Sequence, residues 1–226
     1  MPDSRWERLA AASGILFVVS LIIQGVLLGT PPKVDDSTAT IAAYFTDHRT
    51  KLLASWYIVG LGIVFFFWFL GSLRHTLTQA EGGTGRLSTV AFGAGVAAAA
   101  LAMVTGGVQT ALAFKAAGEG NPAVVRAFFD LSNMVDTMTG FPLAAFILAT
   151  SVVMIRTSAV SRWLGWAGLL VGLAILISSA AIFPESGPLA SKEVVGYIAF
   201  ILFGVWLLAT SIIMVVRKGE TATPTS

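Results

Sequence analysis

Six apolar stretches, each about as long as a helix that crosses a bilayer, constrain this chain more than any other feature of its sequence. They cover residues 9–29, 52–73, 87–114, 138–155, 163–183 and 194–216. A transmembrane helix needs about 20 predominantly apolar residues, whereas a strand of a membrane barrel needs about half as many and alternates apolar with polar residues. Because the stretches are continuous, they predict an all-α integral membrane bundle of six transmembrane helices.

The composition agrees with a chain that lies mostly in lipid. Of its 226 residues, 56% are hydrophobic and 12% are charged, whereas a soluble domain carries about a quarter charged residues. The basic residues stand singly at helix ends, so no nucleic-acid surface is expected. The chain has no cysteine, and its two histidines, His48 and His75, lie on different loops. We therefore expect no disulfide, no metal site and no cofactor.

The lysines and arginines of the connections predict the orientation. With the N-terminus inside, the inner segments hold Arg5, Arg8, Arg74, Arg86, Arg156, Arg162, Arg217 and Lys218, and the outer segments hold Lys33, Arg49, Lys51, Lys115, Arg126 and Lys192. This bias toward the inner side favours cytoplasmic N- and C-termini in a multi-pass plasma-membrane protein. We expect one domain over residues 1–218 and a disordered cytoplasmic tail over residues 219–226.

The connections differ in character, and this difference predicts three helical hairpins in series. The inner turn at residues 82–85 is short and glycine-rich, so we expect it to be flexible. The first and third loops, residues 30–51 and 115–137, are longer. Side chains at positions 35–37 can cap a helix in the former, and Asn121 followed by Pro122 can begin one in the latter. Each of these loops predicts a short surface helix outside the membrane.

Polar residues indicate where a site would lie. No Asp, Glu, Lys, Arg or His stands near the middle of a spanning segment, which argues against proton-coupled pumps and ion exchangers. The remaining polar groups gather in the outer half and predict an outward-facing binding cluster of Gln24, Asp47, His48, Gln109, Asp130 and Asp136. The alternative is that Gln24 and Gln109 bond across helices as packing contacts while the loop charges are solvated.

Neither catalysis nor oligomerisation is fixed by the sequence. Asp47, His48 and Asp136 are the only general acid–base set in the outer half. The first two are sequence neighbours and point about 100° apart on a helix, so no catalytic residue is assigned. Gly168 and Gly172 form a GxxxG motif, which brings helices close together either inside the bundle or in contact with a second copy or a membrane partner.

Four short segments carry a resemblance to a known family. They are Tyr-Phe-Thr-Asp-His-Arg at residues 44–49, Trp-Phe-Leu-Gly-Ser-Leu-Arg at 68–74, Glu-Gly-Gly-Thr-Gly-Arg-Leu at 81–87 and Arg-Trp-Leu-Gly-Trp at 162–166. In these segments the chain resembles uncharacterised multi-pass membrane proteins common in actinobacteria, a family carried as a domain of unknown function. The resemblance covers nearly the whole chain. It implies a bacterial inner-membrane protein, and it implies no activity and no catalytic residues.

Three classes of function stay open. We favour a bundle that binds membrane lipids, or binds or helps move a small apolar or amphipathic molecule from the outer leaflet. A membrane-embedded enzyme acting on a lipid or isoprenoid is the second class. It requires at least two of Asp47, His48, Asp130 and Asp136 to converge in one pocket. An accessory or regulatory membrane subunit is the third.

Overall fold

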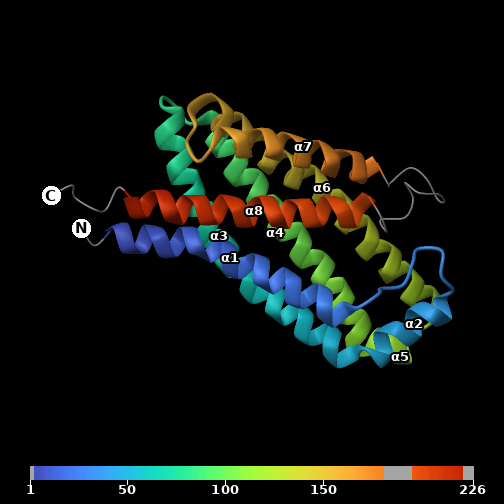
Figure 1. The fold of residues 1–226 in the computed structure, drawn as a ribbon. Helices are drawn as coiled ribbons and strands as arrows, with labels where there is room; N and C mark the ends of the chain where they lie inside the picture. The colour runs from blue at the N-terminus through green and yellow to red at the C-terminus, as the bar shows by residue number, and fades with distance from the viewer. Residues whose placement is uncertain (1–2, 181–194, 221–226) are drawn as a thin grey trace.

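The computed structural model describes residues 3–180 and 195–220 (Figure 1). Its helices are α1 (Asp3–Leu28), α2 (Thr38–Asp47), α3 (Arg49–Glu81), α4 (Arg86–Ala111), the π-helical turn η1 (Leu112–Ala116), α5 (Ala117–Glu119), α6 (Pro122–Thr157), α7 (Arg162–Ser179) and α8 (Val195–Glu220). No strand occurs among the described residues, and six helices are long and apolar enough to cross a membrane. The predicted all-α membrane bundle is confirmed. The connection between the fifth and sixth spanning segments, at residues 184–193, lies outside the described residues. So do residues 221–226 of the predicted tail.

The six spanning helices pack as a closed ring. Each contacts the next spanning helix along the chain, and α8 returns to contact α1. The first residue of α1 and the last residue of α8 lie at the same end of the molecule (Figure 1), as expected for an even number of helices that alternate in direction. The predicted hairpins are α1 with α3, α4 with α6 and α7 with α8. The last of these is not a separate unit, because α7 packs more extensively on α6 than on α8.

The GxxxG motif of α7 faces the interior of this ring. A Cβ at Gly168 would overlap Ser151 Oγ and would lie 2.6 Å from Trp206 Nε1, and a Cβ at Gly172 would lie 2.7 Å from the Leu148 side chain. Both glycines are buried. They therefore let α7 approach α6 and α8 closely, which is the first of the two roles that the sequence left open.

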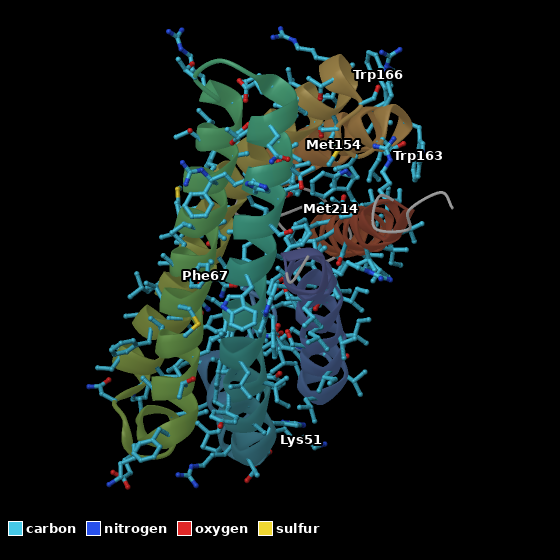
Figure 2. The ribbon with its side chains drawn as sticks, turned by 90° about the vertical axis from the view of Figure 1, so that its left-hand side faces the viewer. Lys51, Phe67, Met154, Trp163, Trp166 and Met214 are labelled. Atoms are coloured by element: carbon cyan, nitrogen blue, oxygen red, sulfur yellow. The ribbon has the colours of Figure 1, made fainter. Side chains whose placement is uncertain are left out.

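The outside of the ring is apolar, as contact with lipid requires. On α3, Phe66 is buried in the ring while its neighbour Phe67 is exposed. Trp163 and Trp166 of α7 are also exposed, at the end of the molecule opposite Lys51 of α3 (Figure 2). Exposed tryptophans at a helix end are typical of the boundary between lipid and water.

The surface helix predicted within residues 115–137 is continuous with the fourth spanning helix. α6 begins at Pro122 as expected, and Asn121 Oδ1 accepts a hydrogen bond from Ala123 N at 2.9 Å. It then runs for 36 residues, about 54 Å at 1.5 Å per residue, which exceeds the ~30 Å hydrocarbon core. The apolar stretch and the amphipathic stretch before it are joined without a break, so the outer turns of α6 project from the bundle.

A second, smaller hydrophobic core fills the outer end. The helix predicted in the first loop forms as α2, and Ser37 caps it by accepting a hydrogen bond from Thr40 N at 3.2 Å. Ile41 and Phe45 of α2 are buried against the outer turns of α3, η1 and α6, including Phe129. The long helices α3 and α6 therefore support α2 above the bundle.

The inner turn between α3 and α4 is closed by a carboxylate. Glu81 Oε1 accepts from Leu87 N at 3.0 Å, and Glu81 Oε2 accepts from Ser88 N at 2.9 Å and Ser88 Oγ at 2.6 Å. The three glycines at positions 82, 83 and 85 have positive φ, which glycine adopts at little cost. The predicted flexible turn is thus a tight reversal in which Glu81 bonds the first free N–H groups of α4.

Candidate functional site

A cavity of about 510 Å³ lies inside the ring, and all six spanning helices line it. Its wall on α4 consists of small side chains, Ala98, Ala99 and Ala102, and Gly140 of α6 lies on the same cavity. Bulky residues at the three alanine positions would occupy the space, whereas a Cβ at Gly140 would overlap Ser179 Oγ of α7. The alanine-rich run of the third spanning segment is therefore what leaves the bundle hollow.

Aromatic rings close the inner end of this cavity. Phe17 and Phe66 line it, and their ring centroids are 4.6 Å apart. Behind them Phe66 packs edge-on against Phe146 at 6.0 Å, and Phe146 packs edge-on against Trp206 at 6.0 Å. Trp206 Nε1 donates to Leu164 O at 3.0 Å, so its polar group is paired. These buried rings form an apolar partition between the cavity and the end of the bundle that carries the termini.

The outer part of the cavity is more polar. The hydroxyls that line it donate to carbonyls of their own helices: Thr137 to Asn133 at 2.8 Å, Thr139 to Val135 at 2.9 Å, and Ser178 and Ser179 to Ile175 at 2.8 and 2.9 Å. Because their protons are used, these hydroxyls can take part in a further hydrogen bond only as acceptors. The charged residues Lys33, Asp35 and Asp136 also belong to the lining. The cavity is thus apolar at its inner end and polar at its outer end.

A segment of the first loop, residues 31–36, forms part of the outer wall, and we call it the strap. Its residues 31–35 line the cavity. Within it, Lys33 N donates to Asp36 Oδ2 at 2.8 Å, which holds the segment in a turn.

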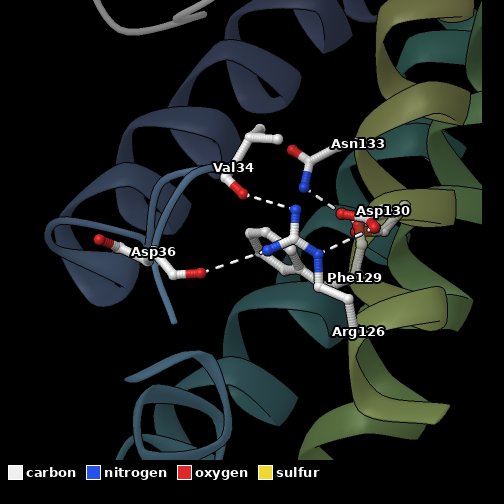
Figure 3. A network of polar contacts seen from close by, with 7 residues as sticks. Val34, Asp36, Arg126, Phe129, Asp130 and Asn133 are labelled. Atoms are coloured by element: carbon white, nitrogen blue, oxygen red, sulfur yellow. Dashed lines mark hydrogen bonds and ion pairs between the residues drawn. The ribbon is translucent and has the colours of Figure 1, made fainter. Parts of the chain in front are cut away.

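Arg126 of α6 fastens the strap (Figure 3). Its Nη2 donates to Val34 O at 2.7 Å, its Nη1 donates to Asp36 O at 3.2 Å, and its Nε donates to Asp130 Oδ2 at 2.9 Å. The planar guanidinium thereby bonds two backbone carbonyls and one carboxylate at once, which the single ammonium of a lysine does less well. Sequence reasoning counted Arg126 only as a topology signal.

Two of the predicted site residues are amides, and neither is among the described residues that line the cavity. Gln109 Oε1 accepts from Trp56 Nε1 at 3.2 Å, a bond between α4 and α3. This is the packing contact that the sequence offered as the alternative for Gln109. Gln24 is half-buried on the outer part of α1.

Of the charged predicted residues, only Asp136 lines the cavity. Asp130 is paired with Arg126 beneath the strap. Asp47 is exposed at the end of α2, and His48 Nδ1 donates to Tyr44 O at 3.1 Å while its ring stacks on the Tyr44 ring. The carboxylates and imidazole that an enzyme would need are therefore not brought together in this cavity.

Tyr44 joins α2 to the outer end of α1. Its hydroxyl donates to Leu28 O at 2.8 Å. Burial, with a smaller contribution from nearby Tyr197 of α8, raises the pKa of Tyr44 to about 12, so the phenol stays protonated and keeps this bond at neutral pH. Tyr44 thus ties α2 to the outer end of α1.

Comparisons with protein-family models, with curated proteins and with solved structures found no match. The resemblance to uncharacterised actinobacterial membrane proteins stays a prediction. The function is therefore argued from the cavity and the residues that surround it.

Proposed function

We propose that this polytopic membrane protein binds a small amphipathic molecule from the surrounding membrane in the cavity within its outer half. The observation that carries the proposal is the cavity's lining, which is aromatic and aliphatic at the inner end and bears hydroxyls and charged groups at the outer end. Ligand pockets typically measure about 300–1,000 Å³ and combine apolar walls with a few polar groups. At about 510 Å³ the cavity fits that description.

The lining also limits which class of ligand can bind and where its affinity comes from. An ion or a sugar would need polar partners at the inner end, where Phe17, Ile63, Phe66 and Phe203 stand. An apolar chain gains about 25 cal/mol for each Å² that leaves water, yet a chain arriving from lipid gains little of this. Affinity must then come from close packing and from the polar groups at the rim.

We propose that the protein lies in the plasma membrane with both termini in the cytoplasm, so that the strap and α2 are extracytoplasmic. The excess of lysine and arginine on the side of the termini supports this orientation. Because the chain has no cysteine, labelling of a single introduced cysteine shows on which side of the membrane its position lies. A cysteine at Val34 should react with a membrane-impermeant maleimide in intact cells, and one at Gly83 only after permeabilisation.

Filling the cavity should abolish binding. Ala102 lines the cavity, whereas Ala100 on the same helix is exposed on the outside of the ring. We expect Ala102→Phe to weaken binding of cis-parinaric acid, a fluorescent fatty acid, by about tenfold or more, which corresponds to about 1.4 kcal/mol. Ala100→Phe should leave the affinity unchanged. Equilibrium titration of protein in nanodiscs, followed by energy transfer from its tryptophans to the probe, measures both. Equal affinities for Ala102→Phe and the wild type would refute the proposed function.

A further inference from the structure

Two helices of the ring, α1 and α8, face each other along matching stripes. Positions three and four residues apart share one face of a helix. On α1 the stripe consists of Ala11, Gly14, Val18, Leu21 and Gly25, and on α8 it consists of Ser211, Leu207, Gly204, Phe200 and Tyr197. Each series runs from the end that carries the termini toward the outer end.

The inner halves of these stripes are in contact. Ser211 Oγ donates to Ala11 O. A Cβ at Gly14 would lie 3.0 Å from Ser211 Oγ, and Val18 and Leu207 are both buried. No space is left between α1 and α8 at this level for a ligand to pass.

The outer halves of the same stripes separate. A Cβ placed at Gly25 or at Gly204 would meet no atom within 4 Å among the described residues. Phe200 and Tyr197 line the cavity and are nevertheless 46% and 49% exposed. Side chains of the cavity wall that are almost half exposed are not covered by neighbouring helices, so the wall is open at these two residues. The ribbons of α1 and α8 also diverge toward the outer end (Figure 1).

We call this opening the lateral window, flanked by Leu21 and Gly25 of α1 and by Phe200 and Gly204 of α8. Toward water it is bounded by the bond between Tyr44 and Leu28, and above the cavity the strap is fastened by Arg126. The window lies on spanning helices, so it faces lipid. Among the described residues, access from water must break the bonds of the strap and of Tyr44, whereas no such bond crosses the lateral window.

The volume of the cavity restricts the kind of lipid. At about 510 Å³ the cavity lies within the range of about 300–1,000 Å³ that is typical of pockets holding one small ligand. This is the size of one fatty-acyl or short isoprenoid chain. A phospholipid carries two such chains, so we expect the cavity to exclude it.

We propose that the cavity takes up a single-chain lipid from the outer leaflet through the lateral window between α1 and α8. The chain lies against Phe17 and Phe66, and the head group stays at the polar rim beside Lys33 and Asp136. This inference rests on the proposed function and adds to it the class of ligand and the route of access.

The experiment plugs the window without filling the cavity. Gly25→Phe and Gly204→Phe place a ring where a Cβ meets no described atom, and Gly93→Phe is the matched control at an exposed, equally open position of α4. Stopped-flow energy transfer from the native tryptophans follows cis-parinaric acid as it passes from donor vesicles of phosphatidylethanolamine and phosphatidylglycerol to the protein in nanodiscs. A phosphatidylcholine with one parinaroyl chain is the two-chain probe.

We expect both plugs to slow association and dissociation of the acid by about tenfold, with an unchanged equilibrium affinity, since a blocked route changes both rates together. The Gly93→Phe protein should behave as the wild type, and the two-chain probe should not bind. If the plugs leave the rates unchanged while Ala102→Phe abolishes binding, lateral access is refuted and the cavity site stands. Binding of the two-chain probe as tight as that of the acid refutes the single-chain class. If the wild type does not bind the acid, or Ala102→Phe binds it equally well, the proposed function itself fails.

Discussion

Gly168→Leu should lower the free energy of unfolding by about 3 kcal/mol or more, at the upper end of what overpacking a core costs. A Cβ at Gly168 would already overlap Ser151 Oγ and lie 2.6 Å from Trp206 Nε1. The larger side chain must push α7 away from α6 and α8, which also breaks the bond from Trp206 to Leu164 O. Unfolding of the purified protein by sodium dodecyl sulfate, followed by circular dichroism and tryptophan fluorescence, measures the loss.

Gly93→Leu is the matched control for this experiment. Gly93 is exposed on α4, and a Cβ there would meet no atom within 4 Å among the described residues. Its replacement by leucine should change the stability by no more than about 0.5 kcal/mol, the range usual for surface substitutions. Equal stabilities of the Gly168→Leu and Gly93→Leu proteins would contradict the close packing of α7 against α6 and α8.

Arg126→Met should release the strap. The substitution removes the bonds to Val34 O and Asp36 O and leaves Asp130 without its cationic partner. Hydrogen bonds to charged groups contribute about 1.5–3 kcal/mol each, so losing even one raises the open population of the strap by about tenfold or more. The amide hydrogens of Lys33 and Asp36 are bonded within the strap. We expect their exchange reaction with deuterated water, followed by mass spectrometry, to become at least about tenfold faster.

Two further variants separate this effect from a general loss of charge. Arg126→Lys should not restore the slow reaction, because one ammonium cannot bond both carbonyls and the carboxylate in the guanidinium's geometry. Lys115→Met removes a cation whose partner Glu119 is 3.9 Å away, with both side chains largely exposed, and it should leave the rate unchanged. A slow reaction in the Arg126→Met protein would show that the strap is held by other contacts.

The spanning segments and the helix starts were predictable because they depend on local sequence. A run of about 20 apolar residues is long enough to cross a membrane wherever it packs. Ser37 and Asn121 cap α2 and α6 through bonds to N–H groups two or three residues away. The continuity of α6 was missed because the prediction sought segments of bilayer length. A helix that extends into water needs no apolar residues there.

The cavity and its strap depend on contacts between distant residues, which a single sequence does not reveal. Arg126 lies 92 residues from the Val34 carbonyl that it bonds. The space in the bundle arises because alanines of α4 face the same interior as Phe17 and Phe66. Of the predicted binding residues, Asp136 lies on the lining of this space and Asp130 is paired with Arg126. Their role in binding stays a prediction.

The most direct test of the proposed site is an experimental structure of the protein extracted with its native lipids and held in nanodiscs. We expect one elongated density that runs from the rim at Lys33 and Asp136 to the rings of Phe17 and Phe66, as wide as a single hydrocarbon chain. The same density should be missing from the Ala102→Phe protein. Side chains that close over the cavity, or a cavity holding only water in the wild type, would contradict a binding site for a single-chain lipid.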